Sequence, residues 1–434
     1  MTTNVMGPDG GRASRTRSRS EARPNHPLRQ RYLRVRALTS RLCDGLEPED
    51  FVVQSMPDVS PTKWHLAHTS WFFETFLLKP RGFTSPDPAY AYLFNSYYNG
   101  VGEQYPRPQR GMLSRPTVRE VQSYRAIIDE AVLATLEADL DARERAIVEL
   151  GLHHEQQHQE LLLTDIKHVL SQNPLHPDFG APWTEAGTET TPLRFVGHAG
   201  GEVEVGHAGT GFHFDNEGPR HRTLLPPFTL GHRLVTVGEY RAFIDDDGYR
   251  RPELWLDEGW HWRQRENIVA PLYWDRTDRD GVRHAFTLSG YRRLEASEPV
   301  VHVSLYEADA YARWADARLP REHELELALR ARPMKGNFVA SGALHPRPAT
   351  GESDVDQLWG DGWEWTQSSY LPYPGYRPPR GAVGEYNGKF MCNQHVLRGG
   401  SCVSSRAHLR ATYRNFFPAS ARWQFTCIRL ARDL

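Results

Sequence analysis

The stretch Gly151-Leu152-His153-His154-Glu155-Gln156-Gln157-His158-Gln159-Glu160 decides how the first half of this 434-residue chain is interpreted. It follows a helix start signal, because Asp141 and Glu144 have the Asp-x-x-Glu spacing of a capping box. The inward stripe of the expected helix, at spacings of three and four, reads Ile147, Gly151, His154, His158 and then Leu161 or Leu162. Two imidazoles therefore interrupt a face that should be apolar. Since residues i and i+4 lie one turn apart on the same side, His154 and His158 could hold one metal ion.

The same stretch matches His-Glu-x-x-His, the pattern of zinc proteases, with Glu155 in the place of the general base. The rest of that pattern is missing. Metzincins carry Gly at the third position after the second His, whereas this chain has Leu161. Gluzincins take a Glu ligand from a following helix, but Asn173-Pro174-Leu175-His176-Pro177 stops helices here. A third ligand is therefore expected from another part of the chain.

Length and composition predict a globular protein with two domains. The chain is too long for one ordinary core, and it is 39% hydrophobic and 24% charged. A net charge of -2 gives no bias toward a nucleic-acid partner. The four cysteines have no Cys-x-x-Cys spacing, which favours a reducing compartment over a disulfide scaffold or thiolate zinc site. No apolar run has the length of a membrane span and no signal-peptide core follows Met1, so we expect a cytoplasmic protein with no membrane partner.

Residues 27–172 have a helical pattern that predicts an antiparallel four-helix bundle. Its helices are expected at roughly 28–44, 61–79, 117–138 and 142–170. Ser60-Pro61 predicts the start of the second helix, and Thr117 with Glu120 predicts that of the third as a capping box. The intervening loop, about 80–116, is long and rich in Tyr, Pro, Gly and Arg, which favours a functional loop over a disordered one.

The second predicted helix supplies a third inward histidine. His68 falls on one stripe with Trp64 and faces the bundle interior, where His154 and His158 also point. Three inward histidines in one bundle predict a three-histidine metal site. The remaining histidines near them are expected to be flanking or surface groups: His65, His153 and His168.

The rest of the chain has a different character. Residues 1–26 are rich in Gly, Ser and Arg and predict a disordered tail. Residues 173–192 form a Pro-bearing linker. From 193 to 434, short β-like runs alternate with Gly, Asn and Pro turns, and helices are expected only near 304–317 and 320–332. The whole chain is therefore expected to be an α+β protein.

Particular motifs in both halves carry a family resemblance. Those of the second half are Asp215-Asn216-Glu217-x-Pro219-Arg220-His221, Val235-Thr236-Val237-Gly238-Glu239-Tyr240, Arg318-Leu319-Pro320, Trp363-Glu364-Trp365-Thr366 and Leu397-Arg398-Gly399-Gly400-Ser401. They resemble the formylglycine-generating-enzyme (sulfatase-modifying factor) domain, which has a C-type-lectin-like fold. The first half resembles a DinB-like bundle.

The two halves in this order resemble the ergothioneine-biosynthesis sulfoxide synthases, the hercynine oxygenase family, over roughly residues 28–434. Three motifs carry this resemblance in combination: Trp64-x-Leu66-Ala67-His68, His154-Glu155-Gln156-Gln157-His158-Gln159-Glu160 and Tyr413-Arg414-Asn415-Phe416-Phe417-Pro418.

Membership implies a mononuclear non-haem iron(II) centre held by His68, His154 and His158. Three imidazoles on one face of an octahedral ion leave three positions for other groups. The implied reaction uses dioxygen to join a thiol sulfur to imidazole carbon 2 of hercynine (Nα-trimethylhistidine), and the product is a sulfoxide.

The resemblance also assigns roles to other residues. A tyrosine is expected to donate a proton or a hydrogen atom, and the Tyr97-Tyr98 pair of the long loop suits that role. Gln157 and Asn415 match positions that bind hercynine, and Phe416 and Phe417 follow in the same motif. Arg107 and Arg110 are candidates for the carboxylate of the thiol substrate.

One departure from the family pattern concerns the thiol. Relatives that use γ-glutamylcysteine hold its glutamyl group with an Asp and an Arg, where this chain has Phe417 and Ala421. Cysteine is therefore the expected thiol substrate. Three alternatives stay open: a 5-histidylcysteine sulfoxide synthase of the ovothiol type, a zinc-dependent DinB-like hydrolase or thiol transferase using Glu155, and a non-enzymatic lectin-like binding module.

Overall fold

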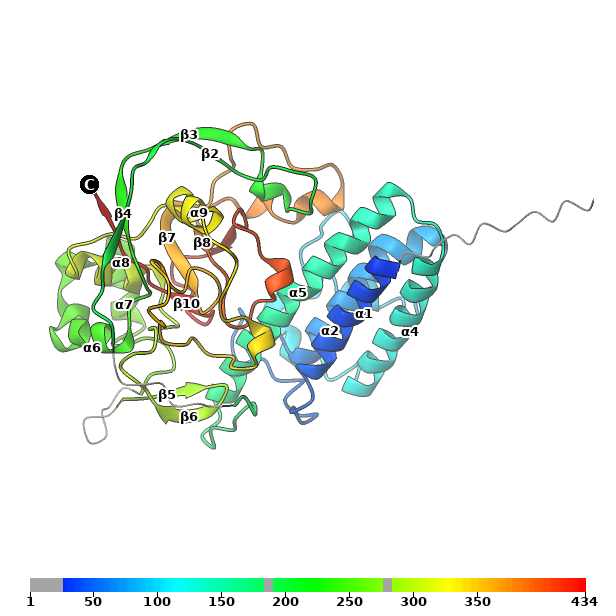
Figure 1. The fold of residues 1–434 in the computed structure, drawn as a ribbon. Coiled ribbons are helices and arrows are strands. Elements are labelled where there is room, and N and C mark those ends of the chain that lie inside the picture. The colour runs from blue at the N-terminus through cyan, green and yellow to red at the C-terminus, as the bar shows by residue number, and fades with distance from the viewer. Residues whose placement is uncertain (1–25, 183–189, 276–282) are drawn as a thin grey trace, which may run out of the picture.

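The computed structural model describes residues 26–182, 190–275 and 283–434, which form two units side by side (Figure 1). The described residues leave out residues 1–25 of the predicted tail and residues 183–189 of the predicted linker. Residue 26, which we assigned to the tail, is the first residue of a helix. Over the described residues, none of the helices combines the length and the apolar character needed to span a bilayer.

The N-terminal unit is the predicted helical bundle. Its long helices are α1 (His26–Arg41), α2 (Thr62–Phe73), α4 (Val118–Glu137) and α5 (Ala142–Ser171). The capping boxes predicted at the starts of α4 and α5 are both present, formed by Thr117 with Glu120 and by Asp141 with Glu144. The α2 helix continues through a π-helical turn and a short 3₁₀ turn, Glu74–Leu78 and Lys79–Arg81.

The start of α2 differs from the prediction. Pro61 occupies the N-cap and no side chain caps the helix, so the predicted Ser60 cap is wrong. The Ser60 hydroxyl instead accepts a hydrogen bond from Arg110 (2.9 Å), and its backbone N–H donates to Asp165 (2.8 Å). Ser60 therefore ties α2 to the long loop and to α5 rather than satisfying the first turn of its own helix.

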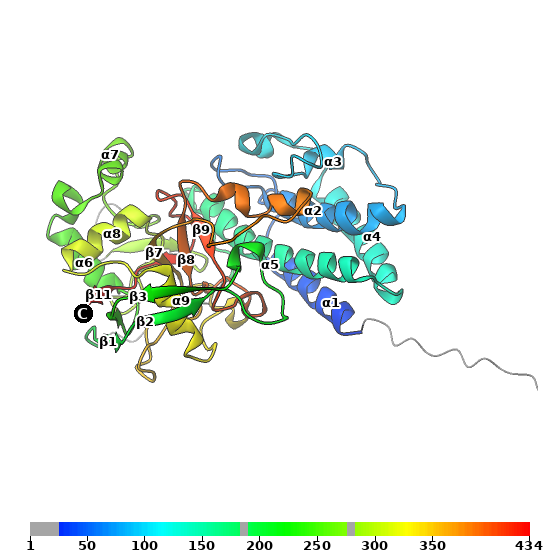
Figure 2. The same cartoon turned by 90° about the horizontal axis from the view of Figure 1, so that it is seen from above.

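The long loop after α2 is ordered and folds over the bundle. It contains the short helix α3 (Tyr90–Leu93) and a 3₁₀ helix (Arg107–Met112). Buried Asn95 donates to the backbone carbonyls of Tyr98 (3.1 Å) and Gly102 (3.0 Å), which holds the tip of the loop in one conformation. In Figure 2 this loop lies beside α2 and next to the orange segment of the second unit.

The second unit contains small sheets rather than one large one. A three-stranded antiparallel sheet has the order β1 (Phe195–His198), β4 (Phe228–Gly231) and β11 (Ala431–Asp433). A four-stranded sheet has the order β10 (Thr426–Cys427), β7 (Trp363–Ser369), β8 (His395–Arg398) and β9 (Asn415–Phe417), with β10 and β7 parallel. Two hairpins complete the strands: β2 (Gly201–Val205) with β3 (His221–Leu225), and β5 (His284–Thr287) with β6 (Gly290–Arg293).

The helices of this unit are only partly those predicted. The two expected helices are α8 (Leu305–Trp314) and α9 (Glu322–Arg330). The sequence analysis missed α6 (Val237–Asp245) and α7 (Asp257–Arg265), which have nine residues each. The start of α6 carries a capping box, Thr236 with Glu239, and that signal could have identified it.

Helix α5 belongs to the bundle and also forms much of the contact with the second unit (Figure 1). Buried Glu160 accepts hydrogen bonds from the indole of Trp363 (2.5 Å) and from the hydroxyls of Ser401 (3.1 Å) and Ser404 (2.6 Å). About two turns further along α5, the buried Lys167 ammonium nitrogen lies 2.7 Å from His302 Nε2. These contacts fix the position of α5 against the second unit.

Candidate metal centre and substrate cavity

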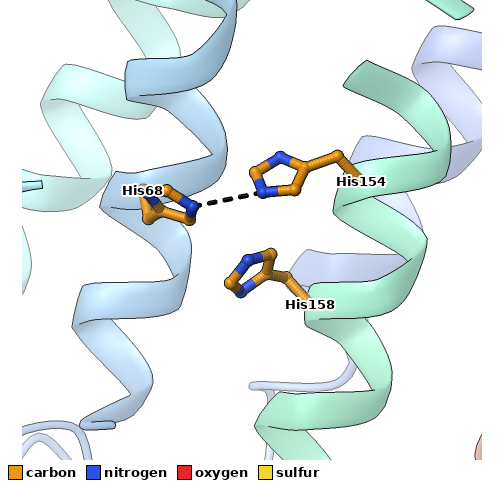
Figure 3. A group of neighbouring side chains, drawn as sticks. All are labelled: His68, His154 and His158. Carbon is orange, nitrogen blue, oxygen red and sulfur yellow. Dashed lines mark hydrogen bonds between the residues drawn. The ribbon is translucent and has the colours of Figure 1, made fainter. Parts of the chain in front are cut away.

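Three histidines meet between α2 and α5, as the sequence analysis predicted. His68 extends from α2, and His154 and His158 extend from successive turns of α5 toward it (Figure 3). One nitrogen of each ring lies within 4.8 Å of one nitrogen of both others, and all three side chains are buried. In the described residues, these are the three side chains whose donor atoms converge in this way.

Hydrogen bonds on the outer side of two of these rings fix which nitrogen faces the centre. His68 Nδ1 donates to the carbonyl of Phe94 at 2.6 Å, which leaves the lone pair of Nε2 facing His154. His158 Nδ1 lies 2.9 Å from Nδ1 of His65, and His65 Nε2 lies 3.1 Å from a carboxylate oxygen of Asp165. A carboxylate only accepts, so His65 donates to Asp165, accepts from His158, and leaves the lone pair on His158 Nε2.

The electrostatic surroundings keep the three rings neutral. Burial lowers the pKa of His154 to about 3, and burial together with the neighbouring histidines lowers the pKa of His68 and of His158 well below the usual range. His154 Nδ1 is buried and has no hydrogen-bond partner among the described side chains. Neutral imidazoles with lone pairs directed at one point are the donor set that a divalent transition metal takes. These residues therefore fit a metal centre.

A cavity of about 250 Å³ opens at this centre, between the bundle and the second unit. It contains the predicted site residues Tyr97, Arg107, Arg110, His154, Gln157, His158, Asn415, Phe416 and Phe417 in its lining. The second unit contributes mainly aromatic and amide side chains to the cavity wall, including Phe214, Trp363, Tyr386, Asn387, Phe390 and Tyr413. The sequence analysis identified the bundle side of this cavity more completely than the opposite side.

Of the two tyrosines predicted as donors, only Tyr97 lines the cavity. Tyr98 lies behind it, fully buried, with its ring stacked on Tyr97 at 4.6 Å between centroids. Tyr386 of the second unit is closer to the metal centre, because its ring lies 5.9 Å from that of His154. The sequence analysis missed Tyr386, which lies after a single 3₁₀ turn (Ala382–Glu385) in a segment with no periodic signal.

Gln157 connects the two units at the cavity. Its amide nitrogen donates to the Tyr413 hydroxyl at 2.7 Å, and its amide oxygen accepts from the Tyr386 hydroxyl. Gln157 directly precedes His158 in the chain, so its amide is fixed beside one of the three converging histidines. Asn415 and Phe416 lie on β9, and the Phe416 ring stacks on Tyr370 at 4.1 Å, which fixes its position in the wall.

The two arginines of the long loop differ in their surroundings. Arg110 is buried, lies with its guanidinium carbon 3.4 Å from the centre of the Trp64 ring, and donates to Ser60. Its Nε has no partner among the described side chains, and burial lowers the pKa of this guanidinium well below its usual range. Arg107 is exposed and donates to the backbone carbonyl of Asp58. Of these two arginines, Arg110 is thus the buried one, and it has no anionic partner among the described residues.

The neighbouring histidines were expected to be flanking or surface groups, and the expectation of a surface position is wrong. His65, His153 and His168 are all buried, with 3%, 3% and 8% of their surface exposed. His65 contacts His158 directly, whereas His153 stacks on Phe212 of the second unit at 3.9 Å. Helical phase assigns a side chain to one face, but on α5 other faces are covered as well, by α1 and by the second unit.

Glu155 points away from the metal centre. One carboxylate oxygen accepts from Arg125 (2.5 Å) and the other from Arg36 (3.0 Å). Burial acts to raise the pKa of Glu155, but the two arginines outweigh it and lower the pKa to about 2. Glu155 therefore joins α5 to α1 and α4 as a buried ion-pair anchor, and this position does not suit the general base of a zinc hydrolase.

Comparisons with known proteins agree with both halves of this description. The DinB superfamily model matches residues 31–162, and the sulfatase-modifying factor enzyme 1-like domain matches residues 184–352 and 341–434. Hercynine oxygenase of Mycolicibacterium thermoresistibile is 32% identical over 444 residues, which covers 94% of this chain and 95% of that protein. Hercynine oxygenase of Mycobacterium tuberculosis is 32% identical over 431 residues, covering 92% and 97% respectively.

The match extends over both units and nearly the whole of each relative, so the order of the two domains is shared and not only their separate folds. The predicted resemblance and the prediction of an oxidoreductase are thereby confirmed. With a bundle that brings three histidines together and a second unit that closes the cavity over them, this chain belongs to the hercynine oxygenase family.

Proposed function

We propose that this protein is an iron(II)-dependent sulfoxide synthase that uses dioxygen to join the sulfur of cysteine to imidazole carbon 2 of hercynine. His68, His154 and His158 would hold the iron. When bound, iron(II) supplies the redox chemistry that couples reduction of dioxygen to formation of the carbon–sulfur bond. The observation that carries the proposal is the convergence of three buried, neutral imidazoles on a cavity shared by both domains, in a chain 32% identical to hercynine oxygenases over almost its full length.

The cavity lining suits hercynine. A trimethylammonium group cannot donate a hydrogen bond and is best held by aromatic faces. Phe416, Phe390 and Trp363 line the cavity, and Gln157 and Asn415 add amides that can hold the imidazole or the carboxylate. We assign the hercynine subsite to this wall.

The bundle side suits the thiol substrate. In the part of the chain that the structure describes, the buried guanidinium of Arg110 has no carboxylate partner and its Nε has no hydrogen-bond partner. Such a group is stabilised when a carboxylate binds to it. We assign the carboxylate of cysteine to Arg110, with Arg107 at the mouth of the cavity in a minor role. This places the thiol between Arg110 and the histidine centre.

Two tyrosines compete for the role of donor. Tyr97 lines the cavity, and its ring lies 6.1 Å from that of Tyr386 between centroids. Tyr386 packs on His154 itself. Burial raises the pKa of Tyr97 and that of Tyr386 well above the usual range of a tyrosine, so both hydroxyls keep their protons. Tyr97, which the sequence analysis predicted, therefore remains the proposed donor. Tyr386 is the alternative donor, because of its position beside His154.

The function is tested by loading the protein with iron(II) without oxygen, adding hercynine and cysteine, and measuring oxygen uptake and product mass. The sulfoxide of joined hercynine and cysteine is expected. Hercynine deuterated at carbon 2 should lose its deuterium, whereas bond formation at carbon 5 retains it. Turnover of histidine in preference to hercynine, with deuterium retained, would establish the ovothiol-type reaction instead.

A further inference from the structure

A chain of hydrogen bonds leads from the surface of α1 to the cavity. Arg31 Nη2 lies 2.6 Å from His153 Nε2, and His153 Nδ1 lies 2.9 Å from His408 Nδ1. His408 Nε2 in turn lies 3.0 Å from the hydroxyl oxygen of Tyr413, which lines the cavity. The chain crosses from the bundle to the second unit without passing through the three converging histidines.

Arg31 fixes the direction of every bond in this chain. A guanidinium donates and never accepts, so His153 Nε2 accepts and the hydrogen of this neutral ring lies on Nδ1. That hydrogen is directed at His408 Nδ1, which must accept, so the hydrogen of His408 lies on Nε2 and points at Tyr413. Each ring therefore accepts at one nitrogen and donates from the other, which is the hydrogen-bonding pattern of a neutral imidazole.

Tyr413 then receives two hydrogen bonds. One comes from His408, and the other comes from the Gln157 amide nitrogen at 2.7 Å. The oxygen of Tyr413 accepts from both, so its own hydrogen is free, and no hydrogen bond uses it among the described residues. Because Tyr413 lies in the cavity wall beside Asn415, that hydrogen is available to a bound molecule.

We propose that Arg31, His153 and His408 are positioning residues that hold Tyr413 as a hydrogen-bond donor toward the carboxylate of the bound imidazole substrate. Without Arg31, both histidines can take the other tautomer, and Tyr413 then donates to His408 instead of to the substrate. The identity of the substrate rests on the proposed function, but the direction of the chain does not.

The direction is tested first, on the iron-loaded protein without substrate, by neutron diffraction from a deuterated crystal. Deuterium is expected on His153 Nδ1 and His408 Nε2, with the Tyr413 deuterium directed into the cavity. Deuterium on His408 Nδ1, or a Tyr413 deuterium directed at His408 or at a reversed Gln157 amide, would overturn the proposal.

The consequence is tested by calorimetry of hercynine binding to the iron(II)-loaded protein in the absence of oxygen. Tyr413→Phe is expected to weaken binding by roughly tenfold, the usual effect of losing a hydrogen bond to a charged group. Arg31→Leu is expected to weaken it by about three- to tenfold, although Arg31 does not touch the cavity. Arg31→Lys should restore binding, because an ammonium also only donates. The exposed Arg34, on the same helix, provides the matched control, Arg34→Leu.

The double variant separates positioning from general stability. If Arg31 acts through the Tyr413 hydroxyl, Arg31→Leu has no further effect in the Tyr413→Phe background. Independent, additive losses in the double variant, or a Tyr413→Phe protein that binds within twofold of the parent, contradict the inference. A parent that does not bind hercynine refutes the proposed function, and the neutron map then still decides whether the chain of hydrogen bonds runs as inferred.

Discussion

The bundle and the second unit meet at one cavity but contribute different chemistry to it. The bundle supplies nitrogen donors and a cation: His68, His154, His158 and Arg110. The second unit supplies rings and amides: Trp363, Tyr386, Asn387, Tyr413, Asn415, Phe416 and Phe417. Metal binding is therefore assigned to the bundle and the shape of the substrate site to the second unit. Variants of the three histidines of the bundle should therefore lower iron affinity, whereas variants in the second unit should change substrate binding and leave iron affinity unchanged.

The largest effect is expected at the converging histidines. Replacing His68, His154 or His158 with Ala removes one of three donors and should lower iron(II) affinity by more than about 100-fold, because losing even a supporting residue costs 10- to 100-fold. Turnover should be lost with the metal. The measurement is iron content after dialysis against a weak chelator. His168→Ala is the matched control, since His168 is also buried on α5 but bonds Ser55 rather than a member of this centre. Equal iron loss in this control would mean that the three histidines are not specific ligands.

The next effect concerns the donor tyrosine and decides which unit supplies it. Phe keeps the ring and removes only the hydroxyl. At the true donor, sulfoxide formation should fall by about 100-fold or more, the usual contribution of a general acid, while iron stays bound and oxidation of the thiol alone increases. Tyr97→Phe, Tyr98→Phe and Tyr386→Phe are compared by product mass. If only Tyr386→Phe loses sulfoxide formation, the donor is Tyr386 of the second unit. If all three variants form sulfoxide at the parent rate, none of these tyrosines is the donor.

A smaller effect is expected at His65, which the sequence analysis placed among the flanking groups. His65 orients His158 through Nδ1 and is itself held by Asp165. His65→Phe should keep the buried volume, remove the hydrogen bond and lower iron affinity by about 10- to 100-fold. His153→Ala should leave iron affinity unchanged and weaken hercynine binding. If the two variants showed the same pattern, the proposed separation between the metal centre and the substrate wall would be wrong.

The part of the site that lies on regular helices could be predicted from the sequence. The i, i+4 spacing of His154 and His158, together with the helical phase of His68, is sufficient to predict that the three side chains converge, as they do in the structure. The bundle was predictable for the same reason, since capping residues and periodic apolar positions are local signals. The prediction that Ser60 caps α2 was wrong because Ser60 forms hydrogen bonds with residues distant in the sequence, Arg110 and Asp165.

Residues contributed by turns of the second unit could not be predicted in this way. Tyr386 and His408 lie in or next to single 3₁₀ turns and approach α5 only because the tertiary fold places them there. The burial of His65 and His153 was missed for a related reason. Periodicity identifies the most apolar face of a helix, but α5 is covered on several sides, and polar side chains there find buried partners that no local pattern encodes.

The smallest predicted effect is the choice of thiol, and it depends on the contrast between Arg110 on the bundle and Phe417 on the second unit. Phe417 lines the cavity and packs near Trp423, whereas Ala421 is buried and does not line it. A γ-glutamyl group would bring a carboxylate and an ammonium against this apolar wall without partners, and an unpaired buried charge costs at least ~1–3 kcal/mol. That cost corresponds to roughly 5- to 150-fold in specificity, since about 1.4 kcal/mol is tenfold.

Cysteine avoids this cost because its carboxylate is assigned to Arg110 and nothing of it reaches Phe417. We therefore expect cysteine to exceed γ-glutamylcysteine by at least about tenfold in kcat/KM, measured side by side at saturating hercynine and oxygen. Phe417→Asp supplies a partner for the ammonium and should narrow the difference, whereas Phe417→Leu, which stays apolar, should not. Equal use of the two thiols by the parent would sink the prediction. An unchanged preference in Phe417→Asp would mean that another part of the cavity selects the thiol.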